Sequence, residues 1–428
     1  MTGSVAPPRR DPDVRRVAER YRRLIDEGAD PGEWAYAWRT ELNRGGFRAV
    51  DFLMDEIVHA GKCIGCASCL TICPVDVFDY DDERPVDTRT EACVYCVLCA
   101  DVCPVLRPPD RDLRDLIGYR EPAGDAGYGP YSYGCYARAT DPEILDRGQD
   151  GGVVSALIIH GLEAGSLAGA VLGDVLPDDS QIGRHRLARD RAAVLACAAS
   201  RYTYSANTLA LQEAMHADVH PVAVVGVPCQ VDGMRLQQHS SIRLEMANWY
   251  RKNVSLVFGL FCSEAFTHES IGRLADLLGV ARDRIANINI KGKVVVRLDD
   301  GEVVTSSLKQ YRKWARPACL YCLDYSAEQA DIGFGGIGLD GWTFCLIRTD
   351  RGHEAFQQAI ADGVIEARPL ADEPRGQFLL EKLSADKKAN RPLPARMPSR
   401  QQREAEGHLD PKTYYTTGPG APVVEQVE

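Results

Sequence analysis

The feature that most constrains this chain is a cysteine pattern that occurs twice within one short stretch. Residues Cys63 to Pro74 read C-x2-C-x2-C-x3-C-P, and residues Cys93 to Pro104 repeat the same spacing. Eight of the 15 cysteines belong to these two copies. Three thiolates spaced two residues apart can surround one iron–sulfur cubane, whereas the fourth, beyond a short helical turn, points to the other cluster. The two copies therefore predict a pair of [4Fe-4S] clusters that exchange their fourth ligands.

This exchange assigns the ligands of each cluster. The first cluster is predicted to be bound by Cys63, Cys66, Cys69 and Cys103. The second is predicted to be bound by Cys73, Cys93, Cys96 and Cys99. Structural zinc is the alternative, but zinc sites usually combine C-x2-C pairs that are separated by longer spacers. Two complete copies, each followed by its proline, favour the clusters.

Composition narrows the class of protein around this motif. A length of 428 residues is typical of about two to three domains, and the 45% hydrophobic and 26% charged residues are typical of a globular chain. The net charge of −11 argues against a nucleic-acid partner, because phosphate contacts need a basic surface. No secretory leader or apolar run long enough for a transmembrane segment is visible, so we expect a cytoplasmic protein whose thiols are reduced.

The chain divides into four expected regions. Residues 1–60 form a helical N-terminal extension, with helices expected at about 14–24, 30–42 and 47–60. Residues 61–110 form the two-cluster domain. From residue 130 to 370, β-type apolar runs alternate with helical patterns, as in a mixed α/β core. Residues 397–428 read as a flexible tail. The expected fold class is α+β, with a ferredoxin-like domain followed by the mixed α/β core.

Four further cysteines are candidates for a third cluster. Apolar runs predict strands at 222–228 and 254–261, which end at Cys229 and Cys262, and the intervening length suits a βαβ crossover. Parallel strands place both thiols at one edge of the sheet, where ligands of such sheets gather. Cys319 and Cys322 add a C-x2-C pair. The alternative is that Cys229 and Cys262 are buried packing groups, which we also expect for Cys135, Cys197 and Cys345.

Glycines and basic residues give weaker signals. A turn at Gln149–Gly152 precedes an expected helix at 153–161, which could bind an anion or pack tightly. Residues Gly333–Gly338 match G-x-G-x-x-G, but a strand rather than a helix is expected at 343–349, which argues against dinucleotide binding and favours a turn beside a cofactor. The basic run Lys309–Arg316 could steer an acidic partner, bind phosphate or form a solvated helix face.

Several of these motifs occur in one order and together resemble a known family, the beta subunits of coenzyme F420 hydrogenases and dehydrogenases. The resemblance covers about residues 130–370, and the cysteine-rich block resembles a bacterial-type two-cluster ferredoxin domain. The motifs are Gln149-Asp-Gly-Gly-Val-Val-Ser155, Ser200-Arg-Tyr202, Gly226-Val-Pro-Cys-Gln230, Cys319-Leu-Tyr-Cys-Leu-Asp-Tyr325 and Ala330-Asp-Ile-Gly-Phe-Gly-Gly-Ile-Gly338.

The resemblance implies a function. Members are iron–sulfur flavoproteins that bind FAD and a [4Fe-4S] cluster, so it favours the third cluster at Cys229, Cys262, Cys319 and Cys322. The FAD contacts implied are Gly151, Gly152, Ser155, Ser200, Arg201 and Tyr202. Two departures are Arg201, where many members have lysine, and Asp150, whose charge suits a phosphate poorly. No catalytic acid or base is implied.

The expected activity is oxidoreduction in which electrons pass between FAD and the clusters. Coenzyme F420 would be oxidised or reduced in a larger redox complex, with a partner subunit or a ferredoxin as electron partner. One alternative is a ferredoxin-dependent reductase of a tetrapyrrole or another small redox substrate. Another is an electron-carrier subunit without catalysis, in which the α/β part is only a scaffold. The sequence does not choose between them.

Overall fold

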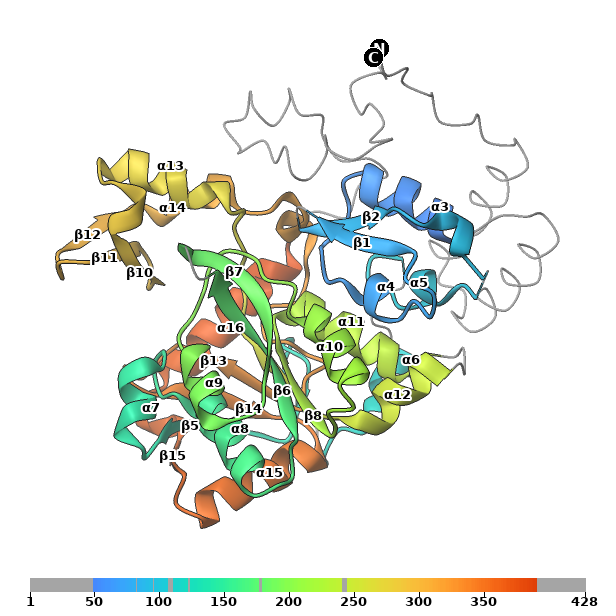
Figure 1. Ribbon diagram of the computed structural model, residues 1–428. Coiled ribbons are helices and arrows are strands. Elements are labelled where there is room, and N and C mark those ends of the chain that lie inside the picture. The colour runs from blue at the N-terminus through green and yellow to red at the C-terminus, as the bar shows by residue number, and fades with distance from the viewer. Residues whose placement is uncertain are drawn as a thin grey trace.

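The computed structural model describes residues 49–390 except 82, 95, 107–110, 122–123, 177–178 and 241–244. Within this part, a mixed eight-stranded sheet forms the centre of an α+β fold, as expected from the sequence. A cysteine-rich segment packs beside the eight-stranded sheet. A separate three-stranded sheet lies apart from this segment (Figure 1). The helices expected at 14–24 and 30–42 and the tail at 397–428 lie outside the described residues.

The central sheet contains the two strands that were expected to end at cysteines. β8 and β9 are parallel, with Val224 opposite Val257, and helices α11 and α12 connect them. β6, β8, β9 and β13 form the parallel centre, whereas β7, β14 and β15 pair antiparallel with their neighbours. In spatial order the strands are β15 (Ile365–Pro369), β5 (Tyr133–Ala139), β14 (Thr343–Ile347), β13 (Ile332–Gly335), β9 (Val254–Leu260), β8 (Val222–Gly226), β6 (Gly169–Leu176) and β7 (Asp179–Ala188).

The side chains of β8 alternate between two apolar cores, one on each face of the sheet. Val222 and Val224 belong to one core cluster, which also contains residues of α10, α11, α12 and the cysteine-rich segment. Ala223 and Val225 belong to the opposite cluster, with residues of α7, α8, α9 and α15. Successive side chains of a strand point to opposite faces, so one apolar run serves both cores. The helices are α7 (Pro142–Arg147), α8 (Val153–Glu163), α9 (Arg191–Ala196), α10 (Ala210–His216), α11 (Pro228–Gln238), α12 (Glu245–Asn253), α15 (Asp350–Ala361) and α16 (Arg375–Lys388).

The cysteine-rich segment is a small unit docked on the helices of the first face. A helix at Ala49–Leu53 that continues as a π-helix at Met54–His59 fits the third helix of the expected extension. The hydroxyl of Thr71 donates to Gln237 of α11 at 3.1 Å, which ties the unit to the core. Its other elements are α4 (Ser68–Thr71), β1 (Phe78–Asp81), β2 (Arg84–Asp87), a 3-10 turn (Thr90–Ala92), α5 (Leu98–Asp101) and α6 (Arg111–Ile117).

A second small unit lies after β9 and has its own apolar core. Ile271 and Leu274 of its helix pack against Ile288 and Val296 of its antiparallel sheet. Its elements are α13 (Glu269–Leu278), β10 (Ile285–Ile290), β11 (Val294–Leu298), β12 (Val303–Ser306) and α14 (Leu308–Tyr311). Short elements elsewhere are β3 (Gly124–Asp125), β4 (Pro130–Tyr131) and 3-10 turns at Asn207–Leu209, Arg282–Arg284, Arg312–Trp314, Pro317–Tyr321 and Leu370–Asp372. No helix among the described residues is long and apolar enough to cross a membrane.

Candidate iron–sulfur and flavin sites

The two cysteine copies fold into matching loops. In each copy a non-glycine residue with a left-handed backbone precedes the short helix that carries the third cysteine: Ala67 has φ +60° and Val97 has φ +67°. This turn reverses the chain so that the three thiols of one copy face inward. The two copies share the same cysteine spacing and the same left-handed turn before the third cysteine.

The structure exchanges the fourth thiols between the copies. Burial raises the pKa of Cys103, and the thiols that raise it further are Cys66 and Cys63 of the first copy. Cys103 of the second copy thus lies with the first copy. The first quartet is Cys63, Cys66, Cys69 and Cys103.

The second group shows the reverse exchange. Burial raises the pKa of Cys99, followed by the influence of Cys96, Cys73 and Cys93. The backbone N–H of Val77 donates to the sulfur of Cys73 at 3.5 Å, as that of Gly65 donates to Cys63 at 3.3 Å in the first quartet. The second quartet is Cys73, Cys93, Cys96 and Cys99.

The third group of thiols comes from three separate segments of the core. Cys229 is the second residue of α11, Cys262 follows β9, and Cys319 and Cys322 lie in and after the 3-10 turn at Pro317–Tyr321. Burial raises the pKa of Cys229, followed by Cys322 and Cys319. Burial also raises the pKa of Cys322 to about 12, which Lys387 opposes. The third quartet is Cys229, Cys262, Cys319 and Cys322.

These quartets suit a cubane better than a single ion. In the described residues no group of three or more His, Cys, Asp or Glu side chains is arranged around one ion position. A tetrahedral zinc site needs sulfur atoms within about 2.3 Å of one centre. A [4Fe-4S] cluster instead binds each thiolate to a different iron, so its four sulfurs are further apart. Four grouped thiols match the ligand set of such a cluster.

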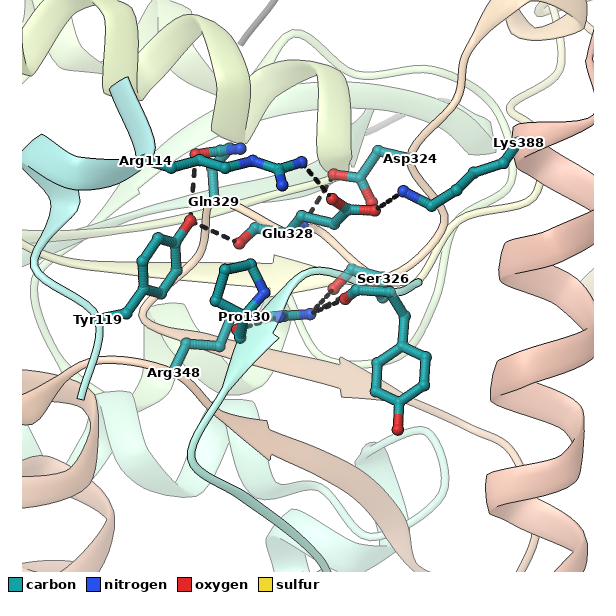
Figure 2. Close-up of polar contacts among 10 residues, drawn as sticks. Arg114, Tyr119, Pro130, Asp324, Ser326, Glu328, Gln329, Arg348 and Lys388 are labelled. Carbon is teal, nitrogen blue, oxygen red and sulfur yellow. Dashed lines mark hydrogen bonds and ion pairs between the residues drawn. The ribbon is translucent and has the colours of Figure 1, made fainter. Parts of the chain in front are cut away.

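The loop that follows Cys322 is held from three sides (Figure 2). Glu328 accepts from Arg114 of α6 at 2.7 Å and from Lys388 of α16 at 2.6 Å. The N–H of Glu328 donates to Asp324 at 2.8 Å, and Arg348 donates to the carbonyl of Ser326 at 3.1 Å. These charged contacts fix the loop that follows Cys322.

The first and third quartets are neighbours across α11. A Cβ placed on Gly233, one turn after Cys229, would lie 3.3 Å from the sulfur of Cys66 and 2.2 Å from the hydroxyl oxygen of Ser68. One helical turn rises about 5.4 Å, so Cys66 and Cys229 are close along the helix. Gly233 is therefore needed because the cluster loop touches the helix backbone.

Arg316 occupies the space between these two quartets. Its guanidinium lies 3.6 Å from the centre of the Tyr204 ring, and its Nε is 3.1 Å from Glu83. The Arg316 charge lowers the pKa of Cys63 and of Cys229, against the larger effect of burial. Arg316 was expected in a basic run that steers a partner or forms a solvated face; the structure instead buries it at the domain junction.

One of the expected flavin residues, Tyr202, contacts β10, as does Gln149 of the glycine turn. The N–H of Ile290 donates to the hydroxyl of Tyr202 at 3.1 Å, and this hydroxyl is 3.4 Å from the Asn289 side chain. Gln149 donates to the same Asn289 oxygen at 3.0 Å. The pKa of Tyr202 is raised mainly by burial, with smaller effects that include Cys262. Tyr202 and the glycine turn therefore meet at β10, and the Tyr202 carbonyl also accepts from the N–H of Phe266, four residues after Cys262, at 2.9 Å.

The charge of Asp150 is compensated in this region. Lys291 lies 3.1 Å from Asp150 and 3.0 Å from Asp340. Burial lowers the pKa of Lys291, but the two carboxylates outweigh burial and raise it overall. A Cβ on Gly336 would lie 1.9 Å from Asp150, so the glycine-rich turn after β13 packs against this carboxylate. Sequence reasoning missed Asn289 and Lys291 because only the tertiary fold brings β10 to the turn.

The remaining expected flavin contacts have mixed surroundings. Gly151 is packed against β5 and β14, because a Cβ there would be 2.5 Å from the Ala137 carbonyl oxygen. Gly152 has φ +66° and begins α8. Ser155 and Ser200 are half-buried. Arg201 is also half-buried and makes no hydrogen bond or ion pair with the described residues, so its guanidinium is available to an anion.

The three remaining cysteines are buried. Cys135 lies opposite Cys345 across β5 and β14, and burial together with Cys135 raises the pKa of Cys345. Burial raises the pKa of Cys197 to about 11. Their positions in apolar clusters agree with a packing role. Residues Gly333–Gly335 of the G-x-G-x-x-G motif lie on β13, so the motif does not open a helix.

A cleft of about 1100 Å³ lies between the cysteine-rich unit and β7. Tyr80 and Tyr204 line it, together with Arg184 and His185 of β7. The six expected flavin contacts are not among its lining residues. The cleft is thus adjacent to the first quartet and separate from the β10 site.

Two ferredoxin-type quartets on a mixed α+β core define an iron–sulfur redox protein. Residues 135–212 and 219–373 match the N-terminal and C-terminal models of the coenzyme F420 hydrogenase/dehydrogenase beta subunit, and residues 56–107 match a 4Fe-4S dicluster domain. The chain belongs to this beta-subunit family. It is an oxidoreductase-family protein with the iron–sulfur domain that the cysteine pattern predicted.

Individual relatives support the same assignment. The chain is 35% identical to the coenzyme F420 hydrogenase subunit beta of Methanococcus voltae over 61% of this chain and 92% of the relative. It is 29% identical to the coenzyme F420-dependent sulfite reductase of Methanocaldococcus jannaschii over 71% of this chain and 47% of that protein. A chain of the F420-reducing [NiFe] hydrogenase complex from Methanosarcina barkeri matches with a TM-score of 0.58 and 32% identity, covering 62% of this chain and 91% of that chain.

Proposed function

We propose that the protein is an iron–sulfur flavoprotein that passes electrons between FAD and three [4Fe-4S] clusters, and that it oxidises or reduces coenzyme F420 as a subunit of a larger redox complex. The observation that carries the proposal is that Tyr202 and the Gln149 turn meet on β10, while the carbonyl of Tyr202 accepts from the N–H of Phe266, four residues after Cys262. A flavin there would lie next to a cluster. The proposed regions are those expected from the sequence, with the two-cluster domain at 61–110 and the core at 130–370.

The groups that would be bound supply the redox chemistry, since flavin accepts a hydride and exchanges single electrons with clusters. The chain supplies binding and charge. We propose that Arg201 pairs with an FAD phosphate, because it has no partner in the described residues and its burial favours a bound anion. Gly151, Gly152, Ser155 and Ser200 would complete the phosphate contacts at the start of α8, and Tyr202 would line the ring pocket.

The arrangement also gives the clusters an order. The first quartet contacts α11 beside Cys229, whereas residues of the second quartet line a small cavity with Ala49 and Val50 on the opposite side of the cysteine-rich unit. Val94, between two ligands of the second quartet, is 54% exposed. We propose that electrons from a ferredoxin or partner subunit enter at the second quartet and reach the flavin through the first and third.

The decisive experiment is anaerobic quantitation of iron and flavin. The proposal expects about 12 iron atoms per chain, because each of three clusters contains about four, together with FAD and bleaching of the flavin by reduced F420. About eight iron atoms without flavin would support the electron-carrier alternative and refute the proposal.

One relative favours a second candidate. The chain is 25% identical to the chloroplastic 7-hydroxymethyl chlorophyll a reductase of Oryza sativa over 65% of this chain and 60% of that protein. A ferredoxin-dependent reductase of a tetrapyrrole would use the same flavin and clusters. Reoxidation of the dithionite-reduced protein by a tetrapyrrole and not by F420 would identify this candidate.

A further inference from the structure

The last described helix, α16, brings a buried lysine to the third quartet. α16 spans Arg375–Lys388 and so begins after the region matched by the beta-subunit models, which ends at residue 373. Lys387 is only 6% exposed, although lysine is rarely buried without a partner. Its position has no explanation in the packing of α16 alone, since Leu380 already anchors this helix to the aromatic cluster below β5 and β14.

The contacts of Lys387 lead to the cysteine-bearing segments. Its ammonium group donates to the carbonyl of Ser263, the residue after Cys262, and to the carbonyl of Cys319 at 3.4 Å. Three residues later, the side chain of Asn390 donates to the carbonyl of Cys322 at 2.7 Å. Three of the four cysteines of the third quartet, or their direct neighbours, are thus bonded to the end of α16.

The local charges leave a positive centre at this place. Glu264 is a carboxylate that acts on Lys387, and it forms an ion pair with Arg312 at 2.5 Å. Lys388 points to the other side of the loop, where it pairs with Glu328 (Figure 2). Both contacts given for the Lys387 ammonium are to carbonyl oxygens rather than carboxylates. Its charge therefore acts on the thiols in a region from which water is largely excluded, opposed by Glu264 at Cys262 and by Asp324 at Cys322.

We propose that Lys387 sets the reduction potential of the third cluster. The inference rests on the proposed third cluster and adds a potential-setting residue to it. Reduction adds one electron and one negative charge to the cluster, with no bond made or broken and no proton taken from Lys387. A fixed positive charge stabilises the reduced form more than the oxidised form, so it raises the potential. Buried charge and hydrogen bonding near the sulfurs are the means by which proteins tune such clusters.

The test is a redox titration of the anaerobic holoprotein followed by electron paramagnetic resonance. Lys387→Gln and Lys387→Met should decrease the ratio of reduced to oxidised third cluster at fixed potential at least tenfold, a shift of about 59 mV to lower potential for one electron. The two ferredoxin-type clusters of the same molecule should not shift. Lys387→Arg should retain the native value, because the charge is kept.

The matched control is Lys382→Gln, which removes the same charge from an exposed position of the same helix. It should leave all three potentials unchanged. Glu264→Gln provides an independent variant, because it removes a negative charge beside the same thiols and should raise the potential of the third cluster. If a neutral Lys387 variant does not retain the third cluster, the potential of Glu264→Gln tests whether charge at this place sets the potential.

Two outcomes would overturn the inference. One is an unchanged third-cluster potential in a Lys387→Gln protein that retains its iron, and the other is an unchanged potential in Glu264→Gln. A native protein with only about eight iron atoms would instead refute the proposed third cluster. Two clusters of about four iron atoms each would account for all of that iron. Iron analysis of the native protein thus separates the two failures.

Discussion

Replacing Arg316 by methionine should loosen the attachment of the cysteine-rich unit to the core. Arg316 belongs to the segment just before Cys319, yet its Nε lies 3.1 Å from Glu83 of the cysteine-rich unit. Its side chain is 2% exposed and that of Glu83 6% exposed. Methionine keeps much of the length and apolar volume of the side chain but leaves the Glu83 carboxylate in the junction without this cation.

The expected cost follows from the burial of both partners. Removing one member of a buried ion pair typically destabilises a protein by about 3–5 kcal/mol. We expect about 3 kcal/mol, at the lower end, because His268 lies 3.3 Å from Glu83 and retains part of the compensation. Since about 1.4 kcal/mol corresponds to tenfold, the detached or unfolded population should rise more than a hundredfold. The loss should shrink at low pH, where the uncompensated carboxylate takes up a proton.

Anaerobic urea unfolding, followed by cluster absorbance and by circular dichroism, measures this effect. The cluster absorbance of Arg316→Met should be lost at lower urea than in the native protein. The matched control is Arg312→Met, four residues earlier, whose ion pair with Glu264 is exposed on the arginine side and should contribute below about 1 kcal/mol. If both variants lose the clusters at the same urea concentration, the Arg316–Glu83 pair does not hold the junction.

Three further substitutions test other parts of the structure. Cys229→Ser should remove about four iron atoms per chain, because one ligand of the third cluster is lost, while the resonance signals of the ferredoxin-type clusters remain; loss of all iron would contradict the grouping. Tyr202→Phe removes the acceptor of the Ile290 N–H at 3.1 Å and should weaken FAD binding about fivefold, given about 1 kcal/mol per hydrogen bond, as measured by flavin release. His239→Gln should reduce the pH dependence of stability: burial, followed by the charge of Arg235, lowers the folded-state pKa of His239 to about 4. The folded state therefore binds fewer protons than the unfolded state. The native protein should lose stability as pH falls from about 7 to about 5, and the variant should lose less. Equal slopes of the free energy of unfolding against pH would disprove this.

Local spacing predicted the parts of the fold that depend on local geometry. The repeat at Cys63–Pro74 encodes its own turn, and the apolar run at 222–226 encodes a strand buried on both faces. The crossover length then predicted that β8 and β9 are parallel. In each of these cases the residues that determine the element are its own or its immediate neighbours.

The sequence did not predict the contacts that join distant segments. Arg316 reads as one member of a basic run, because nothing near it in the sequence indicates that Glu83 will meet it. Asn289 reads as an ordinary strand residue until the fold places it against Gln149 and Tyr202. A buried charge is recognised only from its partner, and here each partner comes from another unit of the chain.

The same contacts give the three quartets different electrostatic surroundings. At the first quartet the Arg316 charge is balanced by Glu83, so the pair acts on the thiols mainly as a dipole. At the third quartet the Lys387 ammonium bonds to carbonyl oxygens and is less balanced. Clusters of one type differ in potential through such surroundings. We therefore expect the third cluster to have a higher potential than the first, which would draw electrons from the cysteine-rich unit toward the β10 site.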